Sequence, residues 1–495
     1  MKNKKGLALD IGVGLLLSLV VAGSYWLQEP FLASVEFKAY DMRAKLRQSL
    51  TSPDEIRLVA IDDDAISQIG RWPWPRTRIA AILDRIQQDK PRVIGLNILF
   101  SEPEENQGLG AIKSLDEKYK DLLAGRKIVQ RGVDFDVEFA SAAAALDSDS
   151  KLLASVAAAG DVVMPLFFVA NPAGSAQPPV AAEISSGAVR APAGIPEGAV
   201  AVESKMIAPM PAFVGAAAGF GHANLYRESD GVLRRETPVI SSGGLLYPSM
   251  ALRLAMAFYG VKPADLKFAP GSEVTAGALR VPVDLAGETP VTFLGPPSAD
   301  VIKHVSYQSL MNGSLGAGYF KDKIVLVGLT ASGLQANFST PIAPDVSSVE
   351  IIANSLENMI HKRFLTRPAW TGQLEWGMLA VIALFIMLVL PRLRAFWGLI
   401  VSVLLSLAIA GAGTYFFMAG QWIKIGYPLI LLLAGYLVVI SKSFLVTEKG
   451  KELVEASAIE TNKMLGLSFQ GQGMLDLAFE KFRLCPLDDN LKDTL

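Results

Sequence analysis

The stretch "EIRLVAIDDDAISQIGRWPWPRTRIAAILDRIQQDKPRVIGLNILF" (Glu55–Phe100) contains the pattern that decides the fold. Its first part, Glu55–Asp62, is a short apolar run rich in β-branched residues, which is typical of a strand. Thr77–Lys90 has apolar side chains at helical spacing, so that one face carries Ile79, Ile82, Leu83 and Ile86. Pro91–Pro103 is a second apolar strand. A strand, a helix and a strand in this order imply a parallel pair.

The same alternation returns later in the chain. Two further strands are expected at Asp161–Phe168 and Tyr319–Leu334. Two further helices are expected at Tyr247–Gly260 and Val349–Arg363. In Ala223–Ile240, Asp230 and Gly231 lie between extended runs, which is a hairpin signal. Val169–Ala199 is rich in Pro, Gly, Ala and Ser and predicts a long exposed excursion. The sum is an α/β domain with a mixed sheet.

Composition narrows the class of protein. The chain has 495 residues, too many for one ordinary domain. Hydrophobic residues make up 51% and the mean hydropathy is +0.35, values typical of a protein with both membrane and soluble parts. The formal net charge of -2, without a long basic stretch, argues against nucleic acid as the main partner. One cysteine, Cys485, excludes an internal disulfide framework and a cysteine-based zinc site. The three histidines, His222, His304 and His361, lack metal-ligand spacing.

Four apolar segments predict transmembrane helices. The first, Ile11–Leu27, follows three lysines, and the other three are Leu374–Leu390, Trp397–Met418 and Ile425–Ile440. The fold class is therefore an α/β extracytoplasmic domain with a mixed sheet, plus one N-terminal and three C-terminal membrane helices. The first segment could also be a cleaved signal sequence with "VAG" as the small-residue site. We favour an uncleaved anchor.

Positive charges predict the orientation in the membrane. Basic residues precede the first apolar segment, lie between the second and third and follow the fourth, at Lys2, Lys4, Lys5, Arg392, Arg394, Lys442, Lys449 and Lys451. With four spans, all of them fall on one side. Residues 29–370 are then extracytoplasmic and both termini are cytoplasmic. The lack of cysteines in the outer part fits a multi-pass protein of the bacterial inner (cell) membrane.

Small residues recur every four positions in the third apolar segment, at Ser402, Ser406, Ala410 and Thr414. Small residues at this spacing let helices approach closely. They mark either packing within the C-terminal group of three helices or a dimer contact. A homodimer through the membrane helices is the predicted oligomer.

Several stretches along the chain resemble the CHASE-2 domain. They include "EFKAYDMRAKLR", "GFGHANLYRESDGVLRRETP", "KIVLVGLTASGL" and "VEIIANSLENMI", and "GRWPWPR" is the most specific of them. The likeness runs from about residue 35 to residue 370. The resemblance implies an extracytoplasmic sensory module of bacterial signalling proteins, linked through membrane helices to a nucleotide cyclase, histidine kinase or Ser/Thr kinase. Asn97 stands where that family usually has an aspartate.

The expected domain organisation follows from these segments. Residues 1–28 form the cytoplasmic N-terminus and first membrane helix, 29–370 the sensor domain, 371–441 three membrane helices and 442–464 a cytoplasmic stalk helix. In 465–495, Leu465, Gly466, Phe469, Gly473, Ala478 and Phe482 fall on the spacing of one tetratricopeptide repeat. Pro486 comes slightly earlier than the usual terminating proline. A lone repeat cannot bury its own apolar face, so this region is expected to be truncated or docked on a partner.

Asp62, Asp63 and Asp64 follow a strand, at the sheet edge where open α/β folds gather their ligands. One hypothesis is a cation site built with Asn97. The other is structural: Asp64 caps the next helix, Asp62 bonds loop amides and Asp63 is solvated. We favour the structural interpretation, because a hard cation needs more oxygen ligands than these residues securely offer.

The motif "GRWPWPR" (Gly70–Arg76) has two tryptophans, each held in extended geometry by the proline that follows. Trp72 and Trp74, flanked by Arg71 and Arg76, could stack on a ligand, an anion or a partner. Alternatively they form a rigid plug at the end of the core, with Arg76 paired to an aspartate of the preceding cluster. The candidate ligand-binding residues are Asp62, Asp63, Arg71, Trp72, Trp74, Arg76 and Asn97.

Three functions remain open. The favoured one is a sensor that relays a ligand or the state of the envelope to a cytoplasmic output domain or kinase outside this chain. The second is a membrane scaffold that binds an envelope protein outside and a partner through its repeat inside. The third is a hydrolase that uses the aspartate cluster. No catalytic motif is present in the sequence, so no enzymatic activity, metal or cofactor is predicted.

Overall fold

The computed structural model describes residues 4–27, 29–47, 54–125, 134–169, 182–192, 195–196, 198–202, 205–334 and 337–485. Pro486 and much of the predicted excursion lie outside these ranges. The chain divides into two compact units. We call residues 37–368 with 414–423 the body, and residues 1–36, 369–413 and 424–495 the helical unit.

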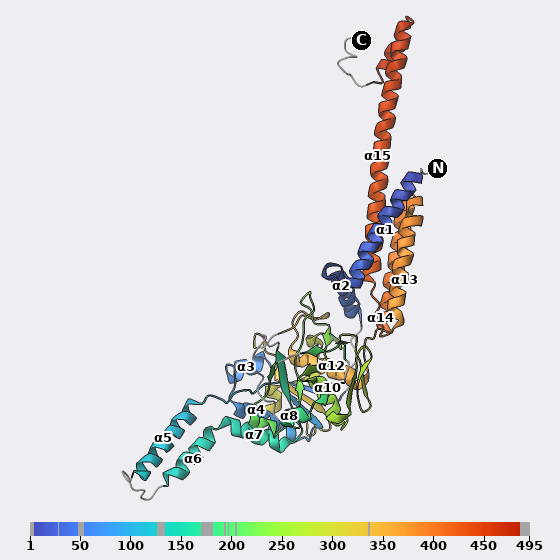
Figure 1. Ribbon diagram of the computed structural model, residues 1–495. Coiled ribbons are helices and arrows are strands. Elements are labelled where there is room, and N and C mark those ends of the chain that lie inside the picture. Colours follow the sequence, from blue (N-terminus) through green and yellow to red (C-terminus); the bar gives the residue numbers. More distant parts are fainter. Residues whose placement is uncertain are drawn as a thin grey trace. The chain divides into compact units, whose positions relative to one another are not determined.

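The body is built on a seven-stranded mixed sheet (Figure 1). Along the path β15–β1–β16–β2–β3 every neighbouring pair is parallel, β7 also pairs with β3 in parallel, and β6 pairs with β3 antiparallel. The prediction of a mixed sheet is therefore confirmed. The strands are β15 (Lys303–Ser306), β1 (Ile56–Ile61), β16 (Ile324–Leu329), β2 (Val93–Leu96), β3 (Val162–Val169), β7 (Gly219–His222) and β6 (Lys205–Ile207).

The strands β1 and β2 run parallel as predicted, but they are not neighbours. β16 lies between them, with Val327 in register with Val59 on one side and with Leu96 on the other. All six residues of β16 are buried, so this strand needs a central place in the sheet. The local strand–helix–strand pattern could not reveal a strand inserted from the far end of the domain.

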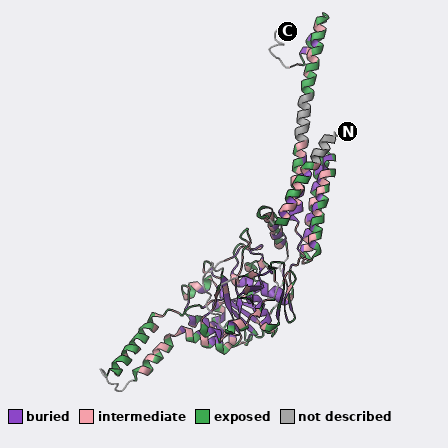
Figure 2. Ribbon diagram, in the orientation of Figure 1, coloured by how far each residue is buried: buried purple, intermediate pink, exposed green. Residues whose placement is uncertain are grey.

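Helices cover both faces of this sheet (Figures 1 and 2). Side chains of β1 alternate between two apolar cores, with Val59 and Ile61 in one and Ile56 and Leu58 in the other. The four predicted apolar positions of α4 (Arg76–Gln87) are buried in the first core, which confirms the helical face. The first core also takes α3 (Asp63–Ile69), α7 (Ser148–Ala159), α9 (Pro211–Val214) and α11 (Tyr307–Met311), and the second takes α10 (Met250–Phe258) and α12 (Ser348–His361).

Three smaller sheets complete the body. They are β4 (Val189–Arg190), β10 (Leu245–Pro248), β9 (Val239–Ser242) and β5 (Ala201–Val202); β11 (Leu266–Ala269), β12 (Glu273–Ala276) and β13 (Leu279–Pro282); and β14 (Thr289–Pro290) with β8 (Arg235–Glu236). Short helices connect some of these strands: α8 (Ala182–Ser186), η1 (Pro263–Asp265) and η2 (Pro297–Ala299).

The predicted hairpin around Asp230 and Gly231 is only partly present. Gly231 has a φ of 83°, and the N–H of Glu228 donates to the carbonyl of Val232 at 2.9 Å, so the turn exists. The residues before the turn form no strand, and β8 pairs with β14 instead. The prediction of two paired runs was wrong, because a more distant partner takes the strand that follows the turn.

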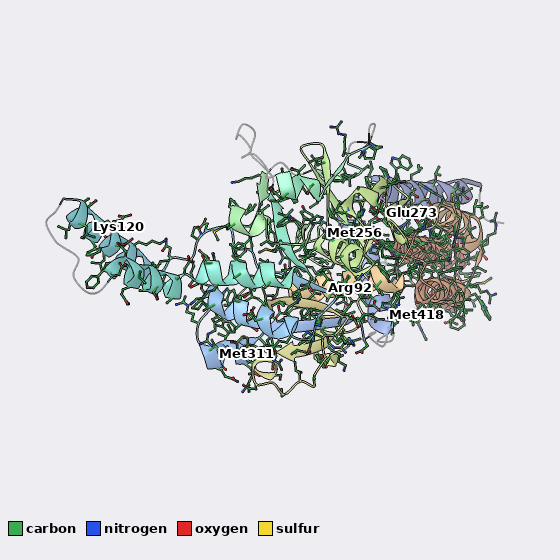
Figure 3. The ribbon with its side chains drawn as sticks, turned by 90° about the horizontal axis from the view of Figure 1, so that it is seen from below. Arg92, Lys120, Met256, Glu273, Met311 and Met418 are labelled. Atoms are coloured by element: carbon green, nitrogen blue, oxygen red, sulfur yellow. The ribbon has the colours of Figure 1, made fainter. Side chains whose placement is uncertain are left out.

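A helical hairpin projects from the body (Figure 1). It consists of α5 (Gln107–Ala124) and α6 (Phe135–Leu146), and neither helix, described over its full length, contains a buried residue. Met256 of α10 lies inside the body, whereas Lys120 lies on the hairpin (Figure 3). The amide of Asn106 donates to the carbonyl of Leu146 at 3.1 Å and holds the two ends of the hairpin together.

In the helical unit, α1 (Lys4–Leu27) packs with two later helices. Tyr25 donates to a carboxylate oxygen of Glu375 in α13 (Trp370–Leu384) at 2.6 Å. Its ring centroid lies 5.3 Å from that of Tyr427 in α15 (Gly426–Gly471). The remaining elements are η3 (Phe385–Val389), η4 (Leu390–Arg392), α14 (Ala395–Met418) and α16 (Leu475–Phe482).

Two helical segments are long and apolar enough to cross a membrane, Trp370–Arg392 and Ala395–Met418. Ile11–Leu27 reaches this standard only together with α2 (Pro30–Leu46), across a bend of 77°. Gly426–Lys442 is a shorter apolar helix. The described residues therefore show two such helices, or three if the bent pair is one span, whereas the sequence predicts four.

The last apolar segment and the charged segment after it form one helix, α15. Near its end α16 folds back, and a Cβ on Gly466 would lie 2.6 Å from the ring of Phe482. Ala478 and Phe482 are buried against Phe469. One short pair of packed helices, the end of α15 with α16, is not specific for a tetratricopeptide repeat. The repeat therefore remains a prediction.

Candidate functional site

A cleft of about 660 Å³ opens in the body, where three strands of the large sheet end. Asn97 follows β2 directly, Leu329 is the last residue of β16, and Phe167 is near the end of β3. Open α/β sheets bind ligands at the carboxyl ends of their strands. The lining residues are Trp72, Pro73, Trp74, Pro75, Arg76, Asn97, Ile98, Leu99, Phe100, Glu104, Glu105, Phe167, Leu329 and Ser348.

The two tryptophans of the motif differ in their surroundings. Trp74 is 5% exposed, its indole N–H donates to the carbonyl of Gly70 at 2.9 Å, and its ring lies 5.1 Å from Tyr307. Trp72 is only partly buried and lies 5.8 Å from Trp74, centroid to centroid. Trp74 therefore closes the core, while Trp72 presents an aromatic surface to the cleft. The interpretation of the motif as a plug at the end of the core thus describes Trp74, and the interpretation as a stacking surface describes Trp72.

Arg76 is held by groups other than the aspartate cluster. Its guanidinium contacts the carboxylate of Asp149 and the carbonyl of Glu102, and it lies 5.1 Å from the ring of Phe100. Burial lowers the pKa of Arg76. The prediction that Arg76 pairs with an aspartate of the preceding cluster was wrong, because Asp149, in the first turn of α7, is brought beside it by the packing of α4 against α7.

Asn97 lines the cleft and carries a buried, unpaired acceptor. Its side chain is 8% exposed, and its amide Nδ2 donates to Oγ of Ser348 at 3.1 Å. Its backbone N–H donates to the carbonyl of Val327, which fixes the residue at the end of the sheet. Among the described residues Oδ1 has no hydrogen-bond partner. An unpaired buried acceptor is costly, so a ligand that donates to it gains affinity.

The remaining predicted residues do not line the cleft. Asp62, rather than Asp64, is the N-cap of α3 and accepts from the N–H of Ala65 at 2.8 Å. Asp63 accepts from the N–H of Ser332 at 3.0 Å and from its hydroxyl at 3.1 Å. Arg71 is exposed.

The cleft therefore brings together four of the seven candidates: Trp72, Trp74, Arg76 and Asn97. Within the described ranges, no group of three or more His, Cys, Asp and Glu side chains is arranged to hold a metal ion.

Two carboxylates of the cleft were missed by the sequence analysis. Glu104 and Glu105 both line it. Glu104 accepts from the backbone N–H of Arg76 at 2.8 Å, while Glu105 is exposed. The stretch "SEPEEN" could have indicated these two glutamates. Its acidic residues follow an apolar strand and therefore lie at the same sheet edge as the "GRWPWPR" motif.

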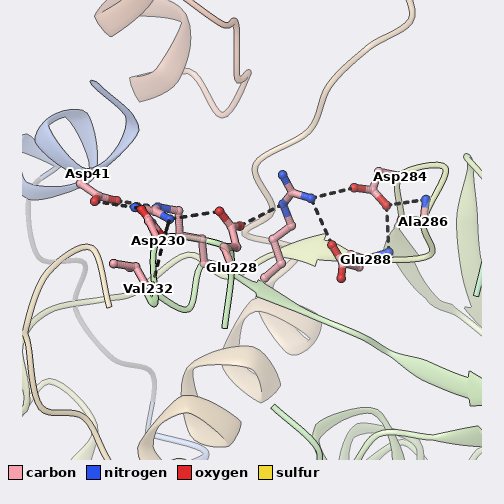
Figure 4. Close-up of polar contacts among 9 residues, drawn as sticks. Asp41, Glu228, Asp230, Val232, Asp284, Ala286 and Glu288 are labelled. Atoms are coloured by element: carbon pink, nitrogen blue, oxygen red, sulfur yellow. Dashed lines mark hydrogen bonds and ion pairs between the residues drawn. The ribbon is translucent and has the colours of Figure 1, made fainter. Parts of the chain in front are cut away.

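A second feature that the sequence did not reveal is a network of ion pairs around Arg234 (Figure 4). The Arg234 side chain is 2% exposed, and its Nε and Nη2 each lie 2.7 Å from an oxygen of Asp41 in α2. It also bonds to Asp230 at 2.8 Å and to Glu228 at 3.0 Å. Burial opposes the charge of Arg234, but the bonds to Asp41 and Asp230 raise its pKa, so the guanidinium stays charged.

The next residue, Arg235, extends this network. Its Nη1 lies 3.1 Å from Glu288, and its guanidinium lies 5.6 Å from the ring of Trp422. Trp422 belongs to a buried cluster with Tyr40, Leu365 and Phe417, which we call the flanking cluster because each member lies close in sequence to an apolar helix. Within the body, the two arginines thus contact Asp41 and Trp422, which lie in segments close in sequence to apolar helices.

The comparisons with known proteins identify the family. The family model of the CHASE2 domain matches residues 15–390. Comparison with the curated proteins and with the solved structures gave no match. The CHASE2 domain is an extracytoplasmic sensory module of signalling proteins and is not itself catalytic. Since the match covers more than half of its residues, the chain belongs to the CHASE2 domain family.

Proposed function

We propose that this protein is a membrane-anchored sensor whose extracytoplasmic ligand occupies the cleft beside Trp72 and Asn97. Occupation of the cleft is relayed to a cytoplasmic output such as a Ser/Thr kinase or a nucleotide cyclase. One observation supports the proposal above all. The cleft lies at the carboxyl ends of the parallel strands, and a buried acceptor and an aromatic surface converge there.

The proposed arrangement in the membrane places residues 29–370 outside a bacterial inner membrane and both termini inside. It keeps the first apolar helix as an anchor. Packing of Tyr25 against Glu375 and Tyr427 supports this, since a cleaved signal sequence would make no lasting contacts with later helices. The proposal includes a homodimer through the membrane helices, because only 11% of the most apolar part of α14 is buried, which leaves surface for a partner helix or lipid.

The relay is proposed to pass through Arg234, Arg235 and the flanking cluster. A ligand shifts a conformational equilibrium only if it binds one state more tightly than the other. Arg234 holds Asp41, which follows the first apolar helix, and Arg235 lies over Trp422, in the loop between α14 and α15. A change in the body would thus reach the first and the last apolar helix together.

A chimera tests the proposal. The catalytic domain of an adenylate cyclase is joined after Met464, and cyclic AMP is measured in cells. Trp72→Ala and Asn97→Leu should each change the output about fivefold, the effect of roughly 1 kcal/mol on a two-state equilibrium. Leu285→Ala, at a side chain that is 80% exposed and outside the cleft, is the control and should leave the output unchanged. Unchanged output in both cleft variants, at normal protein levels, would overturn the proposal.

A further inference from the structure

The side chains that line the cleft are rich in acceptors. The carboxylates of Glu104 and Glu105 and the Oδ1 atom of Asn97 are all groups that can accept hydrogen bonds. Among the described lining residues, Arg76 alone carries a positive charge, and its guanidinium is occupied by Asp149 and the carbonyl of Glu102. Because Asp149 offsets that charge, the cleft has a net negative charge from the two glutamates.

The walls around these acceptors are aromatic and apolar. Trp72 is partly exposed beside Pro73 and Pro75, and Phe167 and Leu329 lie at the strand ends. An aromatic face attracts a cation and also packs against an apolar group. A ligand that suits both features has an apolar body and a positively charged end with N–H donors.

We propose that the cleft binds a small organic amine in its protonated form, with its ammonium group donating to Oδ1 of Asn97 and to Glu105 and its apolar part packed on Trp72. This inference rests on the proposed function, because it names the chemistry of the ligand for the same cleft. A carboxylate or phosphate ligand is disfavoured, since it would meet two glutamates and find no uncommitted cationic side chain among the described lining residues.

Three compounds with one skeleton separate charge from shape. They are 3-phenylpropylamine, 3-phenylpropan-1-ol and 3-phenylpropionate, which end in a cation, a neutral hydroxyl and an anion. Their binding to the full-length protein in lipid nanodiscs is measured by calorimetry and thermal shift. The amine should bind about tenfold more tightly than the alcohol, as expected for one added charge-assisted hydrogen bond, and the acid should not bind.

Two variants locate the site. Glu105→Gln, at an exposed position that tolerates change, should weaken binding of the amine about tenfold and leave binding of the alcohol unchanged. Asn97→Leu removes the buried acceptor. It should weaken the binding of both the amine and the alcohol, since each donates a hydrogen bond to that acceptor. Glu117→Gln, on the projecting hairpin, removes an exposed carboxylate outside the cleft and is the matched control.

The outcomes separate this inference from the proposed function. Tighter binding of the acid than of the amine overturns the ligand class, and so does amine binding that neither cleft variant weakens. If none of the three compounds binds while Trp72→Ala still changes the output of the cyclase chimera, the amine inference fails and the sensory cleft survives. If the chimera does not respond to cleft substitutions, the proposed function itself fails.

Discussion

Arg234 is buried in the body, and its guanidinium bonds to three carboxylates, those of Asp41, Glu228 and Asp230. Each partner is less than a quarter exposed, so water screens these pairs poorly. Removing one member of a buried pair leaves an uncompensated charge, which costs far more than the loss of a surface pair. The side chain therefore matters more for stability than its position directly before the two-residue strand β8 suggests.

We expect Arg234→Met, which keeps most of the side-chain volume, to lower the free energy of unfolding by about 3–5 kcal/mol. Chemical denaturation of the purified full-length protein, followed by tryptophan fluorescence, measures this. Arg280→Met is the matched control, because Arg280 pairs with Glu273 at 2.6 Å but its side chain is 64% exposed. The control should cost at most about 1 kcal/mol. Equal losses in the two variants would show that the Arg234 network contributes no more than a surface pair.

Local patterns at the residue scale could be predicted from the sequence, and long-range pairings could not. The spacing of Ile79, Ile82, Leu83 and Ile86 was enough to place the buried face of α4. The partner of Arg76 was not predictable, because Asp149 is brought beside it only by the packing of α4 against α7. The bond between Asp41 and Arg234 has the same origin, since it joins two segments that no local pattern connects.

At the scale of elements, α12 was predicted as a helix, but its burial was not. Every residue from Val349 to Ile360 is buried, although Glu350, Asn354, Glu357 and Asn358 resemble a solvent-facing set in the sequence. Asn358 accepts from the N–H of Thr292 at 2.7 Å and donates to its carbonyl at 2.9 Å. Asn354 likewise accepts from the N–H of Leu294 at 3.0 Å. Both asparagines thus pair with backbone groups of another segment, a use that helical periodicity cannot distinguish from exposure to water.

The N-terminus of α12 carries a pH-sensitive contact. Ser347 and Glu350 form a capping box, and the other oxygen of Glu350 lies 3.2 Å from Nε2 of His304 in β15. Nδ1 of His304 lies 3.1 Å from Asp300. Burial opposes the imidazolium, but the bonds to Glu350 and Asp300 outweigh it and raise the pKa of His304 above 6.5.

Because the folded protein binds this proton more tightly, the contribution of His304 to stability is fully present below pH 6.5 and is lost as the pH rises through the raised pKa. We expect His304→Gln to destabilise the full-length protein by about 1–2 kcal/mol at pH 6 and by less at pH 8.5. The difference in melting temperature between the two proteins, measured across this range, tests the sign. A difference that stays constant or grows with pH would contradict the assignment.

The arrangement of the whole molecule in the membrane is constrained by the body itself. Residues 414–423, the end of α14 and the loop after it, belong to the body, where the N–H of Thr366 donates to the carbonyl of Gly420 and the N–H of Trp422 donates to the carbonyl of Thr366, both at 2.9 Å. Residues that share one folded unit lie on the same side of a membrane. If the two apolar helices between Thr366 and Gly420 span the membrane as proposed, we expect them to cross it out and back. The positive-inside rule predicts that Arg392 and Arg394, between these helices, lie on the cytoplasmic side, opposite the proposed side of the body.

Reporter fusions test this arrangement at four positions. Alkaline phosphatase, active only outside the cytoplasm, should be active when fused after Val202 and after Gly420, and inactive after Leu393 and Met464. Green fluorescent protein, which fluoresces only when it folds inside, should give the reverse pattern and is the control for expression. The two fusions within the body must agree with each other, because Gly420 is bonded to Thr366. Phosphatase activity after Leu393, or fluorescence after Val202, would place the body in the cytoplasm and contradict an extracytoplasmic sensor.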